Sequence, residues 1–127
     1  MEQMVILMQR HLNCIREIGN LTVELEESLQ RNDQAAASLI LRQRAEQMAK
    51  ADRCMEELRG LAALSPQMDL AVNRLFANPP VPPGPQAAEE EQRAYEIRLS
   101  ARRLIEGIRR QDERISRRMA GKKSFYQ

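Results

Sequence analysis

The sequence predicts an all-α protein, an antiparallel helical bundle of three long helices plus one short helix with coiled-coil-like packing. Hydrophobic residues make up 43% of the 127 residues but aromatic residues only 3%, which indicates an aliphatic helical core, because strands favour β-branched and aromatic side chains. Apolar residues also recur at helical spacing. Five of the six prolines lie within residues 79–85, so three long periodic segments are free of this helix-breaking residue.

Residues 2–31 are expected to form the first helix, because apolar residues repeat there every seven positions. One seam position holds Met1, Met8, Ile15, Thr22 and Leu29, and the other holds Met4, His11, Ile18 and Leu25. Such a helix is about 44 Å long and suits packing along other helices. A lone histidine on this seam is typical of a register-setting or partly exposed core residue.

A short turn at Arg31-Asn32-Asp33 separates the first helix from a second, expected over residues 33–64. Asn32 or Asp33 can cap the second helix, and so short a turn makes the two helices antiparallel neighbours. The expected seam of the second helix is Ala37, Leu41, Met48, Ala51, Met55, Leu58 and Ala62.

Ser65-Pro66 predicts a new start and a short third helix over residues 66–77, because serine can cap and proline fits the first helical position. The Pro-rich connector 78–86 excludes helix and favours polyproline II. It is interpreted as a stiff connector, with an SH3 ligand at Pro79–Pro82 as the alternative.

The last helix is expected over residues 87–120, followed by a tail, 121–127, that carries Phe125 and Tyr126. Its seam is interrupted at Gln111 and Asp112. The four helices are expected to form a single domain, 1–127. The predicted core of this domain is Met8, Ile15, Ile18, Leu25, Leu41, Met48, Met55, Leu58, Leu104, Ile108 and Ile115.

The sequence offers little for catalysis. It has no phosphate-binding glycine loop, and no carboxylate lies near its single histidine at a telling spacing. Cys14 and Cys54 are interpreted as small apolar fillers. We therefore expect no enzyme activity, no cofactor and no bound metal. No apolar run approaches the ~18 residues of a membrane span, so a cytoplasmic location is expected.

Basic charge is concentrated at the end of the chain. Residues 98–127 hold 10 of the 20 Lys and Arg residues but only 3 of the 18 Asp and Glu residues. Such a face could meet phosphates, although no aromatic residues interleave with the arginines and the other helices are acidic. Neutralisation of the neighbouring acidic helices is the alternative. Nucleic-acid binding is therefore a less favoured hypothesis.

Several residues are similar to a family pattern. The second helix opens with Asp33 and carries Leu41 and Arg44, and the last helix holds Ile108, Asp112 and Ile115 in an I-x-x-x-D-x-x-I pattern. Together with the long first helix, Lys122-Lys123 and the near-terminal Tyr126, this layout resembles the flagellar type III export chaperones of the FliT and FlgN kind. The sequence departs from them in its proline-rich connector.

The resemblance implies a cytoplasmic chaperone that binds the helical C-terminal region of a hook-associated or filament-cap protein, prevents premature assembly and contacts the export apparatus. The alternative from the residues alone is a generic helical adaptor or coiled-coil subunit, and the heptads of residues 1–29 leave a homodimer open. The stiff connector, the interrupted seam and the aromatic residues beyond the last helix indicate that this helix and its tail either contact the client or cover the groove until a client arrives. The expected partner-binding residues are Leu104, Ile108, Ile115, Met119, Phe125 and Tyr126.

Overall fold

The computed structural model describes the backbone of residues 1–126 and the side chains of residues 1–121. This part of the chain is helical and contains no strand, which confirms the all-α prediction. The elements are α1 (Glu2–Gln30), α2 (Gln34–Gly60), the 3-10 helix η1 (Leu61–Leu64), α3 (Pro66–Phe76) and α4 (Glu89–Tyr126).

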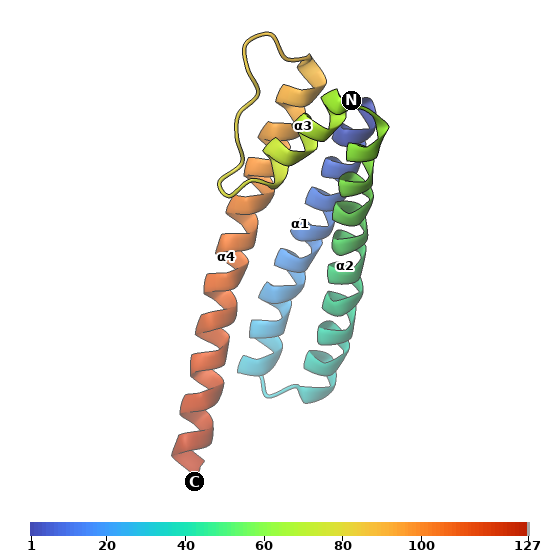
Figure 1. Ribbon diagram of the computed structural model, residues 1–127. Helices are drawn as coiled ribbons and strands as arrows, with labels where there is room; N and C mark the ends of the chain where they lie inside the picture. Colours follow the sequence, from blue (N-terminus) through green and yellow to red (C-terminus); the bar gives the residue numbers. More distant parts are fainter. Residues whose placement is uncertain (127) are drawn as a thin grey trace.

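Helix α1 is the central element of the fold (Figure 1). It runs antiparallel to α2, packs along both α2 and α4, and has the same direction as α4, whereas α2 and α4 share little backbone contact. The short helix α3 lies across the end where α1 begins and α2 ends.

Two local caps explain where helices restart. Asn32 has φ 58°, a left-handed conformation that asparagine tolerates better than most residues. Asp33 then caps α2, its side chain accepting a hydrogen bond from Ala36 N at 3.1 Å. Ser65 caps α3 in the same way, accepting from Met68 N at 3.1 Å, and Pro66 follows at the first helical position.

The core consists of three clusters of buried residues along α1. The first lies under α3 and contains Met4, Leu7, Met8, Leu58, Met68, Ala71, Leu75 and Ala94. The middle cluster contains Ile15, Ile18 and Ala51, and the last contains Leu21, Leu25, Ala37, Ile40 and Ile115. Burial of each large aliphatic side chain contributes about 1.5–3 kcal/mol, so α1 holds the molecule together through all three.

The core prediction is correct for Met8, Ile15, Ile18, Leu25, Leu58 and Ile115, which are all buried. It is wrong for three residues: Leu41, Met48 and Leu104 are 52%, 40% and 38% exposed. Met55 and Ile108 are half-buried.

The error in α2 has a simple cause. The side of α2 that is buried carries Ala37, Ile40, Arg44, Ala51 and Leu58, so an arginine occupies a seam position. When the seam is assigned from apolar residues alone, it is placed on the neighbouring stripe that contains Leu41 and Met48. Each of these two residues lies about 100° around the helix from the residue before it, Ile40 or Gln47.

The ends of the helices also differ from the expected ranges. The last turn before Ser65 is the 3-10 helix η1, which begins directly after Gly60. Helix α4 begins at Glu89, two residues later than expected, and continues to Tyr126 through the segment expected as a tail. Gly121 does not have positive φ. A single glycine costs a helix only about 1 kcal/mol relative to alanine, so it does not by itself end one.

Candidate functional site

A groove lies between α2 and α4, with α1 as its floor. It has a volume of about 320 Å³, within the range of small ligand pockets. We call it the central groove. Its lining residues are His11, Ile15 and Ile18 of α1, Arg44, Met48, Ala51 and Asp52 of α2, and Ile105, Ile108, Arg109 and Asp112 of α4.

Apolar side chains form most of the floor and walls of the central groove. Ile15 and Ile18 are buried beneath it, and Ile105 and Ile108 of α4 are half-buried and pack against them. On the opposite wall Met48 is 40% exposed. This continuous aliphatic surface, open between two charged helices, matches the narrow apolar stripe of an amphipathic helix.

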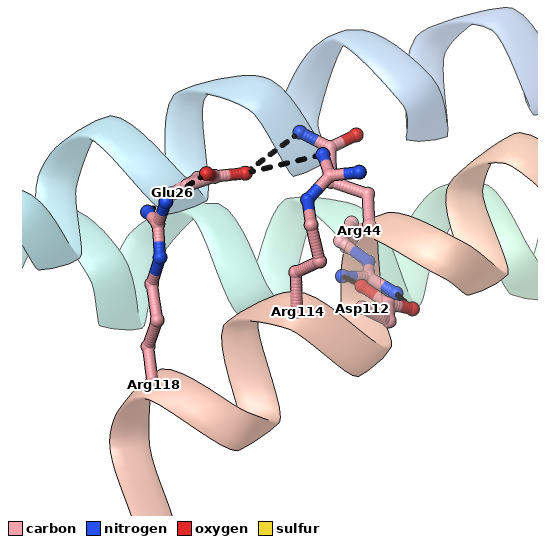
Figure 2. A network of polar contacts seen from close by, with 6 residues as sticks. Glu26, Arg44, Asp112, Arg114 and Arg118 are labelled. Carbon is pink, nitrogen blue, oxygen red and sulfur yellow. Dashed lines mark hydrogen bonds and ion pairs between the residues drawn. The ribbon is translucent and has the colours of Figure 1, made fainter. Parts of the chain in front are cut away.

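An ion pair between α2 and α4 lies at one end of the central groove (Figure 2). Arg44 donates through both terminal nitrogens to the two carboxylate oxygens of Asp112, at 2.8 and 2.7 Å. The Arg44 side chain is 10% exposed and that of Asp112 is 39% exposed. Bidentate pairs of this kind are short and directional. The seam interruption at Asp112 is therefore the partner of a buried arginine on another helix.

Glu26 of α1 contacts polar side chains in the C-terminal half of α4 (Figure 2). It accepts hydrogen bonds from Gln111 at 3.1 Å and Arg118 at 3.0 Å, and Arg114 lies 4.0 Å away. The Glu26 side chain is only 17% exposed. Part of the basic charge of α4 therefore neutralises Glu26. This agrees with the interpretation that the basic residues neutralise the neighbouring acidic helices.

His11 is a buried polar residue in the wall of the central groove. Its side chain is 5% exposed, its Nδ1 lies 3.4 Å from the Ala51 carbonyl oxygen, and its Nε2 is buried without a hydrogen-bond partner. Burial lowers the pKa of His11 from 6.5, and Arg98 adds to this effect, while the Ala51 carbonyl and Asp52 oppose it. The imidazole is therefore held neutral at ordinary pH, as a core residue is.

The expected partner-binding residues do not form a single surface. Ile108 lines the central groove, whereas Ile115 and Met119 line a second hollow of about 330 Å³ beside Leu29. Leu104 is exposed and belongs to neither hollow. The side chains of Phe125 and Tyr126 lie outside the described residues.

Sequence reasoning missed the contribution of α2 to the site. The sequence predicts Met48 to be in the core, and it indicates Arg44 only as part of the family resemblance. One feature of the sequence could have indicated this contribution. Both α2 and α4 carry aliphatic side chains beside the seam that packs on α1, and such additional apolar residues indicate a second apolar face on each helix.

The described residues contain no group of three or more His, Cys, Asp or Glu side chains that could hold a metal ion. Among the same residues, none of the helices has the length and hydropathy needed to cross a membrane. The sequence matches no protein-family model, and neither a curated protein nor a solved structure is similar to it.

Proposed function

We propose that this protein binds an amphipathic helix of a partner protein in the central groove, and that it acts by binding and not by catalysis. One observation carries the proposal: aliphatic side chains from three helices line one groove between charged helices. A partner helix placed there would contact Ile105 and Ile108 on one side and Met48 on the other, burying its own apolar stripe in the manner of helix-in-groove recognition.

The dimensions of the site support a helical occupant. The groove and its continuation along α4 extend from Arg98 to Asp112, a length of about 21 Å at 1.5 Å per residue. This is four turns of helix, enough for apolar anchors at i, i+3, i+4 and i+7. We take the three long helices as one bundle with coiled-coil-like packing, in which the partner would become a fourth long helix.

The more specific proposal is a cytoplasmic export chaperone for the C-terminal helix of a flagellar axial protein. Its support is that three residues of the family resemblance line the central groove. Arg44 and Asp112 form the ion pair at its end, and Ile108 lies one turn of α4 away. The general alternative, a helical adaptor of another kind, would use the same groove. The pairing of Arg114 and Arg118 with Glu26 favours a protein partner over nucleic acid, since it removes charge from a phosphate-binding face.

Calorimetric titration with an amphipathic peptide tests the binding proposal. The C-terminal peptide of a flagellar hook-associated protein and a designed leucine-striped helix of about 16 residues, about 24 Å long, are suitable probes. We expect both to bind, and Met48→Glu to abolish binding by placing a charge on the apolar wall. Leu39→Glu is the matched control, because Leu39 is 51% exposed on α2 but does not line the groove.

The outcomes separate the alternatives. Binding of the designed helix but not of the flagellar peptide would support an adaptor and overturn the chaperone proposal. Failure of every helical peptide to bind, or equal affinity in the Met48→Glu and Leu39→Glu variants, would overturn the use of the central groove. A concentration-dependent dimer in sedimentation that is lost with Met48→Glu would show that a second copy of the chain occupies the groove instead.

A further inference from the structure

We propose that the central groove continues into a carboxylate-binding pocket that recognises an acidic residue in the last turn of the partner helix. This inference rests on the proposed function and adds the chemistry and direction of the partner. The pocket has a volume of about 300 Å³ and is lined by Phe76, Ala77, Asn78, Arg98, Arg102, Ile105, Glu106 and Arg109. We call it the arginine pocket.

Two arginines are held in place in this pocket by neutral acceptors. Arg98 donates through Nε to the Leu75 carbonyl oxygen at 3.2 Å, and Arg102 donates through a terminal nitrogen to Asn78 Oδ1 at 2.9 Å. Both acceptors come from the end of α3 and the residues that follow it. Each guanidinium keeps further N–H groups for a ligand, because arginine has five donors in a planar fork.

Neither of these arginines forms an ion pair within the described part of the chain, in contrast to several other arginines of α4. Arg109 and Arg110 lie 3.7 Å from Glu106, and Arg117 lies 3.9 Å from Glu113. Arg98 is half-buried, and burial, together with the nearby positive charge of Arg102, lowers its pKa. Glu106, the acidic residue in the pocket lining, lies 3.7 Å from Arg109 and Arg110 and forms no ion pair with Arg98 or Arg102. Two adjacent cations that form no ion pair make an arriving carboxylate favourable.

The arginine pocket is continuous with the central groove, because Ile105 and Arg109 line both. The groove is therefore asymmetric along its length: arginines without ion pairs lie at the end near α3, and the closed Arg44–Asp112 pair lies toward the other. An apolar surface with cations at one end complements a helix with an apolar stripe and acidic residues at one end.

The direction of the partner follows from the helix dipole. The last turn of a helix presents carbonyl groups without intrahelical donors and a partial negative charge. When the last turn lies over Arg98 and Arg102, its partial negative charge and an acidic side chain are both attracted to the two arginines. The partial positive charge of a first turn placed there would be repelled by them. The partner helix would then end near α3 and run in the direction of α2.

Three designed peptides test the proposal by calorimetry. All three carry the same leucine stripe and have acetylated and amidated ends, so that only side chains differ in charge. One has two glutamates in its last turn, one has them in its first turn, and one has glutamine at all of these positions. We expect the first peptide to bind about tenfold more tightly than the other two, the size of one charge-assisted contact.

Protein variants locate the effect. Arg98→Gln with Arg102→Gln should bind all three peptides equally, at the affinity of the glutamine peptide. Arg110→Gln with Arg117→Gln is the matched control and should keep the tenfold preference. It removes the same charge from side chains that are 72% and 76% exposed and that line neither the central groove nor the arginine pocket. Arg102→Gln alone is tested as well, because Arg102 bonds only to the exposed Asn78 and its loss leaves the core intact.

The results distinguish this inference from the proposed function. Equal binding of the three peptides to the unmodified protein would overturn the carboxylate pocket and leave helix binding standing. Tighter binding of the peptide with first-turn glutamates would overturn the direction. If no peptide binds but a single-stranded oligonucleotide does, and the double substitution at Arg98 and Arg102 removes that binding, both proposals fail and the pocket binds phosphate.

Discussion

Replacement of Asp112 by asparagine tests the ion pair that joins α2 to α4. The substitution keeps the size and nearly the helix propensity of the side chain but removes the charge that Arg44 faces. Arg44 then retains one good acceptor at most, in a position where its side chain is only 10% exposed. The variant therefore leaves a cation that is almost buried without its counter-charge.

The cost can be worked from the exposure of the two partners. Loss of one member of a fully buried pair costs about 3–5 kcal/mol, and a hydrogen bond to a charged group contributes about 1.5–3 kcal/mol. Water can reach the Asp112 side, which is 39% exposed, so the lower figures apply. We expect Asp112→Asn to reduce the free energy of unfolding by about 1–3 kcal/mol.

A double-mutant cycle measured by urea unfolding and circular dichroism provides the assay. Arg44→Met should restore stability when it is added to Asp112→Asn, because it replaces the unpaired cation with an apolar chain of similar length. Glu106→Gln with Arg110→Gln is the control cycle, since this exposed pair at 3.7 Å should couple by less than about 0.5 kcal/mol. The reasoning is refuted if Asp112→Asn is as stable as the unmodified protein or if Arg44→Met brings no recovery.

Three further predictions concern the core, a cap and pH. Ile15→Ala should cost ~2–5 kcal/mol in urea unfolding, while Met48→Ala, at an exposed site, should cost less than about 1 kcal/mol; equal costs would contradict the core assignment. Asp33→Ala should lower the stability by about 1 kcal/mol by removing the hydrogen bond to Ala36 N, and Asp33→Ser should retain most of it. Because burial lowers the pKa of His11 below 6.5, the unfolded chain binds more protons, so stability should fall as the pH drops below 6.5, and His11→Gln should show a weaker fall between pH ~7 and ~5.

The first helix shows where sequence reasoning works. Its heptad seam is apolar at nearly every position, and the seam residues Met4, Met8, Ile15, Ile18 and Leu25 are all buried. Here local periodicity and tertiary burial agree, because α1 is covered on both sides and its seam meets two partners. The capping signals are also local, since a cap depends only on neighbouring residues. Ser65 caps α3 as expected, and of the two candidates Asn32 and Asp33 it is Asp33 that caps α2.

The second helix shows why the remaining core residues could not be predicted from the sequence. Arg44 occupies a buried position only because Asp112, 68 residues further along the chain, supplies both of its acceptors. A pattern of apolar residues cannot contain that information, so the expected seam leaves Arg44 out and includes Leu41 and Met48 instead. Met48, which is left outside the core, lines the central groove, whereas Leu41 is exposed and does not.

The ion pair between Arg44 and Asp112 connects the stability of the protein with its proposed function. Helices α2 and α4 share little backbone contact, so the pair between Arg44 and Asp112 fixes the distance between the walls of the central groove at that end. A partner helix must fit that distance, and its affinity should depend on the pair even where it touches neither residue. We therefore expect Asp112→Asn, at a temperature where the protein remains folded, to weaken binding of the leucine-striped peptide. Glu113→Gln should leave binding unchanged, because Glu113 forms an exposed pair with Arg117 and lines neither the central groove nor the arginine pocket. Equal affinity in both variants would show that packing on α1 alone sets the width of the groove.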